Sequence, residues 1–219
     1  MRQVYTWMTG GLLLTAIVAG YLGQNTEMVY EILTNKPVFY GLMIAQLGLV
    51  IGLSFAIQRI SAGAATFLFL AYAALTGVTF STLFLVYTQE SIGSVFLTTA
   101  CGFAGLSILG FTTKRDLGPV GAFCGMALFG LIGWAILSWI FPSMMGEQGQ
   151  WVYSVIGVVV FAGLTAYDTQ KLKNMSFEGS GADMAAVQHK AAIFGALTLY
   201  LDFINLFLNL MRLMGDRRR

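Results

Sequence analysis

Apolar residues dominate this chain in seven long runs, which short polar connections separate. The runs cover residues 6–23, 38–58, 63–87, 92–112, 119–141, 151–170 and 190–213. A helix needs about 20 apolar residues to cross the hydrocarbon core of a bilayer, and each run is close to that length. No run alternates strictly between apolar and polar residues, as a membrane β-strand would. We therefore predict an all-α polytopic membrane protein, with a single transmembrane domain of seven helices over residues 1–219.

The composition excludes an ordinary soluble protein. Hydrophobic residues make up 57% of the chain and charged residues only 10%, whereas a soluble domain carries about 25% charged residues. The net charge of +2 is too small and too dispersed for a nucleic-acid-binding surface. The expected partner is the lipid bilayer, and no nucleic acid is expected.

Basic residues predict the orientation, because Lys and Arg are enriched in cytoplasmic loops. With a cytoplasmic N-terminus, the following basic residues lie inside: Arg2, Arg59, Lys114, Arg115, Lys171, Lys173 and Lys190. Only Lys36 is then basic among the outer loops. Seven full spans would nevertheless place the final arginines, 217–219, outside. Either the C-terminus tolerates this placement, or one apolar run is re-entrant.

Two acidic residues lie within the apolar runs. Asp168 is near the inner end of the sixth run, and Asp202 is near the middle of the seventh. A carboxylate at the centre of a membrane helix costs about 2.5–3.5 kcal/mol on insertion scales, so such residues are candidates for a functional site.

A polar stripe surrounds these acids. The residues Thr198, Asp202, Asn205, Asn209 and Arg212 follow one another at spacings of four, three, four and three, so they share one helix face. Thr165 lies three residues before Asp168 and faces the same way on its own helix. We expect the stripe to face protein or water rather than lipid.

The two acids would meet if their helices are antiparallel neighbours and the sixth helix runs past Lys173, or the seventh begins deep. Two adjacent carboxyl groups in a low dielectric cannot both ionise readily, so they would share a proton and titrate as a unit. Their oxygens also suit Ca²⁺ or another hard cation, with further oxygens from Thr165, Asn205, carbonyls and water. The alternative is that each acid bonds a neighbouring helix and only fixes packing.

Two further residues could respond to charge or pH. Arg59 ends the second run on the same predicted side as Asp168, either as a positive-inside anchor or as a latch that pairs with that acid. His189 is the only histidine, and we interpret it as a solvated loop residue beside Lys190.

The chain resembles the Bax inhibitor-1 family, also called the transmembrane Bax inhibitor motif family, and is closest to its bacterial members. The resemblance rests on the seven-run layout, on Tyr167-Asp168 followed by basic residues, on residues 112–117, and above all on residues 199–207. It implies a central last helix wrapped by the first six, and a proton-regulated Ca²⁺ leak. The functional acid pair would fall on Asp168 and Asp202, and the latch on or next to Arg59. The expected location is the bacterial inner membrane.

The leading functional hypothesis is a pH-sensitive cation leak channel, with calcium as the transported ion and no cofactor. One alternative is a non-transporting regulator that binds other membrane proteins, such as proteases or stress factors. An intramembrane aspartyl protease is less favoured, because Leu199-Tyr200-Leu201-Asp202 lacks the GxGD setting of that class. The chain also lacks a P-loop, a zinc-binding HExxH motif and a GxSxG nucleophile elbow, so we do not expect an enzyme.

Overall fold

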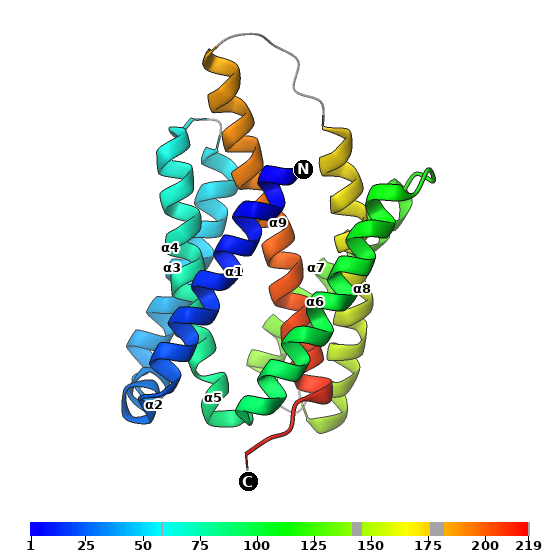
Figure 1. Cartoon of the computed structure of the whole chain (residues 1–219). Helices are drawn as coiled ribbons and strands as arrows, with labels where there is room; N and C mark the ends of the chain where they lie inside the picture. Colours follow the sequence, from blue (N-terminus) through cyan, green and yellow to red (C-terminus); the bar gives the residue numbers. More distant parts are fainter. Residues whose placement is uncertain (58, 142–145, 176–181, 219) are drawn as a thin grey trace. The chain divides into compact units, whose positions relative to one another are not determined.

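The computed structural model describes residues 1–57, 59–141, 146–175 and 182–218, and its regular elements there are all helices (Figure 1). These are α1 Arg2–Gly23, α2 Thr26–Thr34, α3 Lys36–Ala56, α4 Ala62–Ser81, α5 Leu83–Val86, α6 Gln89–Thr112, α7 Gly118–Ile140, α8 Glu147–Asn174 and α9 Ala182–Met214. In the described ranges the only β-pairing is an isolated bridge between Tyr87 and Arg217. The all-α prediction is confirmed.

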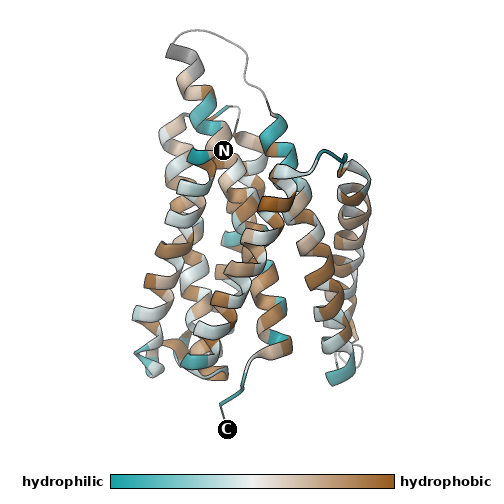
Figure 2. Cartoon of the chain, turned by 45° about the vertical axis from the view of Figure 1, so that its right-hand side comes forward, coloured by the Kyte–Doolittle hydropathy of each residue, from teal (hydrophilic) through white to brown (hydrophobic). Residues whose placement is uncertain are grey.

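Within the described ranges, seven helical segments are long and apolar enough to cross a membrane. They are Arg2–Gly23, Lys36–Ala56, Ala62–Val86, Gln89–Thr112, Gly118–Ser138, Glu147–Asn174 and Ala185–Met214. Large apolar side chains are exposed on several of them, such as Phe55 (83%) and Phe129 (77%). Apolar surface of this kind is costly in water and suits contact with lipid. In Figure 2 the hydrophilic colour is concentrated toward the helix ends.

The structure corrects the connection that we placed between the first two spans. Residues 26–34 form α2 instead of an unstructured loop. The side chain of Asn25 caps this helix by accepting a hydrogen bond from the Met28 amide, and Asn35 caps α3 in the same way. The side chain of Val29 is fully buried, so this short helix has an apolar anchor.

The C-terminal residues lie at the α5–α6 connection. The Arg218 amide donates to the carbonyl of Val86, and the Asp216 amide donates to the hydroxyl of Ser91. The chain after α9 therefore reaches the end of the helices at which α5 stops and α6 begins. This placement agrees with seven full spans, because an odd number of crossings separates that connection from the N-terminus. Arg219 lies outside the described residues.

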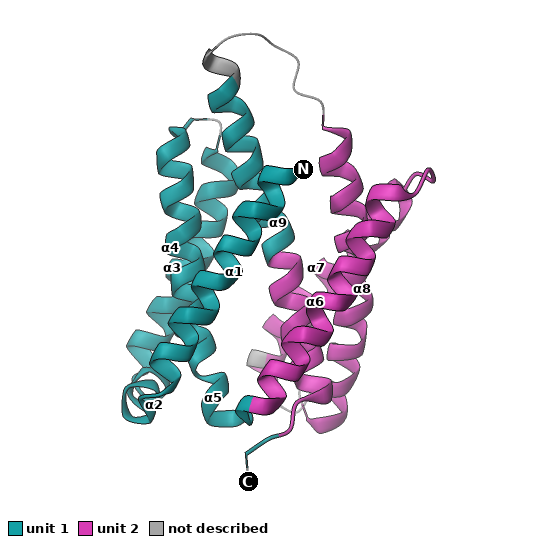
Figure 3. Cartoon of the chain, in the orientation of Figure 1, with its two compact units in different colours: residues 1–89, 176–200, 217–219 teal, residues 90–175, 201–216 magenta. Residues whose placement is uncertain are grey.

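The chain packs as two compact units (Figure 3). Unit 1 contains residues 1–89, 176–200 and 217–219, and unit 2 contains residues 90–175 and 201–216. Helix α9 contributes residues to both units. The single transmembrane domain that we predicted over residues 1–219 stays a prediction.

Tyr200 is at the centre of unit 1. Its side chain is fully buried and lies edge-on against the rings of Phe69 and Tyr72 on α4. Its hydroxyl is 2.6 Å from the hydroxyl of Thr15 on α1. Thr15 also lies within hydrogen-bond distance of the carbonyl of Ala73 on α4 (2.8 Å). One buried polar cluster therefore joins α1, α4 and the first part of α9.

In unit 2, α8 is in contact with α6, α7 and the last part of α9. An apolar cluster holds α7, α8 and α9 together; its buried members are Cys124, Leu131, Val160, Phe161, Leu164 and Leu206. On α6, the rings of Phe96 and Phe103 pack edge-on against Phe203 of α9. The backbones of α6 and α8 approach closely where Gly110 lies against the carbonyl of Ala166. Small residues permit such close approach between membrane helices.

Helix α9 is the most buried of the seven spans. Of its most apolar window, 67% is buried, against 6–39% in the other six. It supplies fully or nearly fully buried side chains to both units, including Ile193 and Leu197 in unit 1 and Phe203 and Met211 in unit 2. A helix that is apolar on all sides and carries a few polar groups can be stable only if those groups find partners inside the protein.

We predict that Gly110→Ala destabilises unit 2. The added methyl group would overlap the carbonyl of Ala166, so α6 and α8 would have to move apart. Overpacking of this kind costs about 1–3 kcal/mol, which should lower the midpoint of thermal unfolding in detergent. The control is Gly105→Ala on the same helix, where no atom lies within 4 Å of the new methyl group. Equal midpoints for both variants would contradict the close contact.

We also predict that Tyr200→Phe destabilises unit 1, because it removes the hydroxyl that bonds to Thr15. Loss of one buried hydrogen bond costs about 0.5–1.5 kcal/mol. The free energy of unfolding in detergent should fall by that amount. Tyr21→Phe is the matched control, because the side chain of Tyr21 is 76% exposed. If Tyr21→Phe lowered the free energy as much, the buried cluster would have no special role.

Candidate functional site

Helix α8 continues beyond Asp168 toward its C-terminal end. The helix runs to Asn174 and therefore past Lys173, which fulfils one of the two conditions under which we expected the acids to meet. Asp168 is partly buried, and Lys171, one turn further along, interacts with it electrostatically. The acid is therefore inside the helix rather than at its frayed end.

The carboxyl groups of Asp168 and Asp202 are joined by a side-chain hydrogen bond. Both residues belong to unit 2, so α8 and α9 bring them together within one compact body. A carboxylate accepts hydrogen bonds but donates none, so two carboxyl groups can bond to each other only if a proton lies between them. The two residues are therefore a candidate proton-sharing pair.

Asp202 is the more enclosed member of the pair. Its side chain is only 5% exposed, and its buried Oδ2 has no hydrogen-bond partner among the described residues. No cluster of three or more His, Cys, Asp or Glu suited to a metal was found in the described ranges. The two carboxyl groups by themselves supply only part of the oxygen ligands that a cation such as Ca²⁺ takes.

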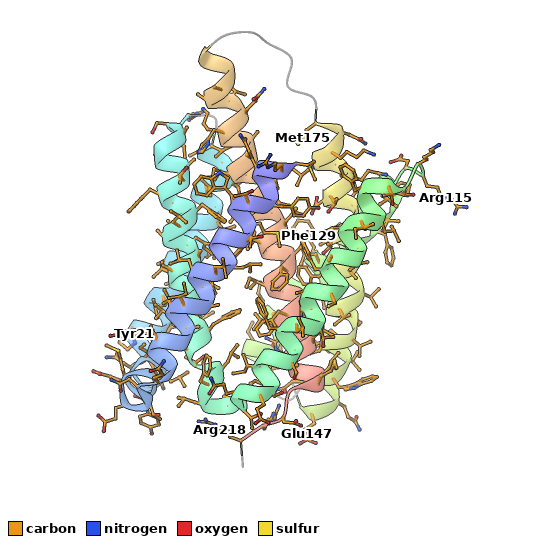
Figure 4. All side chains as sticks on the ribbon, in the orientation of Figure 1. Tyr21, Arg115, Phe129, Glu147, Met175 and Arg218 are labelled. Carbon is orange, nitrogen blue, oxygen red and sulfur yellow. The ribbon has the colours of Figure 1, made fainter. Side chains whose placement is uncertain are left out.

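A polar clamp fixes the end of α8 beside Asp168. The side-chain amide of Gln170 accepts from the amide of Leu117 and donates to the carbonyl of Arg115, each at 2.8 Å. Arg115 is labelled in Figure 4, in the connection between α6 and α7. Lys173 donates to the carbonyl of Phe111 at 2.7 Å and lies over its ring. These contacts hold the α8 turn that carries Asp168 against the α6–α7 connection.

Two further contacts hold the same turn of α8 in unit 2. The ring of Tyr167 packs against Gly121 of α7, where a larger residue would collide with it. The hydroxyl of Thr169 donates to that of Ser107 on α6, at 3.5 Å. Residues on both sides of Asp168 therefore have fixed partners, which orients its carboxyl group toward α9.

The other residues of the predicted stripe bond mainly to their own helix. Thr165, which is fully buried, donates to the carbonyl of Phe161, and Thr198 donates to that of Phe194. The side-chain amides of Asn205 and Asn209 donate to the carbonyls of Leu201 and Asn205. Asn209 is buried, and Asn205 is half-buried. Among the described residues, the bonds that these four side chains make stay within one helix, whereas the two acids interact with each other between α8 and α9.

The predicted latch residue, Arg59, lies in the turn after α3, where its amide bonds to the carbonyl of Ala56. Its side chain is exposed. Arg59 belongs to unit 1 and Asp168 to unit 2, so the latch stays a prediction.

Our interpretation of His189 as a solvated loop residue is wrong. The residue is part of α9, its Nε2 lies 2.9 Å from the hydroxyl of Thr66, and its ring packs edge-on against Trp7. Lys190 follows it and donates to the carbonyl of Ile60. These partners come from distant parts of the sequence, so the local polarity around His189 did not reveal them.

Sequence reasoning also missed Gln170 and Ser154. Gln170 belongs to no motif, and only its place two residues after Asp168 could have drawn attention to it. Ser154 is fully buried on α8, but a serine in an apolar run is common and carries no signal by itself.

Comparisons with known proteins agree with this architecture. A family model described as "Inhibitor of apoptosis-promoting Bax1" matches residues 1–219. The inner membrane protein YbhL of Escherichia coli is 51% identical over 218 residues, which cover 100% of this chain and 92% of that protein.

Two other bacterial relatives are described only as uncharacterised proteins. An uncharacterised protein of Deinococcus radiodurans is 42% identical over 99% of this chain and 90% of its own length. Another, from Borreliella burgdorferi, is 40% identical over 100% of this chain and 92% of its own length. With seven helices able to span a bilayer and a family match along its whole length, the chain belongs to the Bax inhibitor-1 family and is an integral inner membrane protein.

Proposed function

We propose that this protein is a pH-sensitive cation leak channel, and that the Asp168–Asp202 pair is its gating group. The observation that carries the proposal is the hydrogen bond between the two carboxyl groups inside a membrane protein. Acidic residues are rare in membrane spans, and those that occur often mark ion or proton pathways. Calcium is the ion that we expect, and no enzymatic activity or cofactor is part of the proposal.

A proton and a cation would compete for the pair. With one shared proton, the two carboxyl groups attract each other through a hydrogen bond. When the proton leaves at higher pH, two neighbouring negative charges remain, which repel each other and attract a divalent cation. Binding of the cation to the pair should therefore strengthen as the pH rises and weaken as it falls.

The small number of oxygen ligands in the pair favours passage of a cation over its permanent binding. Two carboxyl groups supply four oxygens, whereas Ca²⁺ takes 6–8 oxygen ligands. A cation at the pair would keep part of its water shell or borrow backbone carbonyls, so it would be held weakly enough to leave. A leak pathway needs sites of this kind, which a cation can both enter and vacate.

We predict that Asp168→Asn and Asp202→Asn each abolish the pH response of calcium flux. The amide is nearly isosteric with the carboxyl group but does not titrate in this range. Ca²⁺ uptake into proteoliposomes would be followed with an encapsulated dye between about pH 6 and about pH 8. A gate that binds one proton can change the flux by up to about tenfold per pH unit in the wild type, and both variants should be flat.

The control is Glu147→Gln, which removes an exposed carboxyl group from the first turn of the same helix, α8. Its pH response should match that of the wild type. Unchanged flux and pH response in both aspartate variants would rule out the pair as the gate. If the wild-type protein passed no cation at all, the non-transporting regulator would become the better reading.

A further inference from the structure

Two buried polar atoms lack partners at the other end of the contact between α8 and α9. The hydroxyl of Ser154 and the side-chain carbonyl oxygen of Asn209 have no hydrogen-bond partner among the described residues. The side chain of Ser154 is fully buried, and that of Asn209 is 4% exposed. Buried polar groups are nearly always satisfied by protein or by ordered water.

The two atoms belong to one place in unit 2. The side chain of Asn209 lies directly over Gly157 on α8, where a methyl group would come within 2.5 Å of its Oδ1 and 2.7 Å of its Nδ2. Ser154 is three residues before Gly157, and residues so spaced share one face of a helix. Ser154 therefore lies on the face of α8 that the Asn209 side chain covers at Gly157.

Ser154 differs from other buried hydroxyl groups in the same unit. Thr99 and Thr165 each donate to the carbonyl four residues earlier in their own helix. This local bond satisfies a hydroxyl group without any partner from outside the helix. Ser154 makes no such bond, so its buried hydroxyl group is left without a partner among the described residues.

This end of the α8–α9 contact also lies close to an exposed charge. Arg212, one turn beyond Asn209 on α9, is exposed, and its guanidinium group lies over the ring of Tyr153 on α8. Arginine side chains near helix ends extend toward the aqueous boundary of a membrane. Ser154 is itself only seven residues from the start of α8 at Glu147, or about 10 Å along the axis.

We propose that Ser154 and Asn209 form a second polar site that takes water, through which hydrated cations reach or leave the Asp168–Asp202 pair. The available groups are the Ser154 hydroxyl, Oδ1 of Asn209 and the second N–H of its amide, which together match the two to four partners of a buried water. The role in cation passage rests on the proposed function. The binding of water does not.

Cysteine accessibility tests the water site without any measurement of flux. Ser154→Cys and Asn209→Cys would each be introduced in a Cys101→Ala, Cys124→Ala background, and membranes would be treated with a water-soluble methanethiosulfonate. The thiolate is the reactive form and needs water around it, so both cysteines should react at least about tenfold faster than cysteines in the neighbouring apolar core.

The matched controls come from the same helices. Val160→Cys on α8 and Leu206→Cys on α9 replace buried members of the apolar cluster. Thermal unfolding in detergent would confirm that each variant is folded. If the variant at one of the two tested positions does not fold, the other position still tests the proposal. A rate ratio near one between the tested position and its control on the same helix would overturn the proposal.

Gly157→Ala supplies a second measurement that does not depend on the serine. Its methyl group would occupy the space of the Asn209 amide, so labelling of Ser154→Cys should slow at least about fivefold in the double variant, because the reagent meets less water. Gly105→Ala, whose new methyl group meets no atom within 4 Å, should leave the rate unchanged. An unchanged rate with Gly157→Ala would contradict a site between Ser154 and Asn209.

The two proposals can fail separately. If calcium flux responds to the aspartate variants while labelling at residues 154 and 209 stays at the level of the apolar controls, the channel stands and the second site is wrong. If both positions label rapidly but the wild type passes no calcium, the water site stands and the channel is wrong. With both results positive, Asn209→Ala should lower the calcium flux severalfold without removing its pH response, since the acid pair is intact.

Discussion

Every polar group inside a bilayer must find its partner within the protein, and this constraint organises both units. Lipid tails offer no hydrogen bonds, so an unpaired carboxyl, hydroxyl or amide group is costly there. Asp202 on α9 is the most demanding case, because its side chain is almost fully enclosed. Its partner is Asp168 on α8. Helix α8 must therefore place Asp168 next to Asp202 in unit 2. The contacts of Gln170, Lys173 and Tyr167 all hold the turn of α8 that carries Asp168.

The same constraint explains why α9 is the most buried span. It carries Tyr200 into the centre of unit 1 and Asp202 into unit 2, two residues further on. Tyr200 finds the hydroxyl of Thr15, and Asp202 finds a carboxyl group. A tyrosine–threonine bond needs no change of protonation, whereas a carboxyl–carboxyl bond exists only while a proton is present. The first bond does not depend on pH. The second would depend on pH, and this difference is the basis of the pH response that we propose.

The sequence predicted those features that depend on a short segment of the chain or on its summed hydropathy. Hydropathy over about 20 residues predicted all seven spans, because crossing a bilayer requires that length whatever the neighbours are. Helical spacing placed Asp202 and Asn209 on one face. Features that depend on distant partners were not predictable: α2 is only nine residues long and is fixed by asparagine caps and one buried valine, and His189 is held by Trp7 and Thr66. Charged neighbours such as Lys190 made that part of α9 resemble a loop.

Some buried polar groups of this protein have a hydrogen-bond partner, and others have none among the described residues. Thr165 and Asn205 bond back to their own helices and could be present for packing alone. The hydroxyl group of Ser154 makes no such bond. The amide N–H of Asn209 does bond back to the carbonyl of Asn205, but its buried Oδ1 has no partner among the described residues. A purely structural core would lose free energy by keeping them, since an apolar residue at either position would remove the unsatisfied atom. The path that we propose along the α8–α9 contact would give a role to the polar groups at both of its ends, whereas packing alone would not require them.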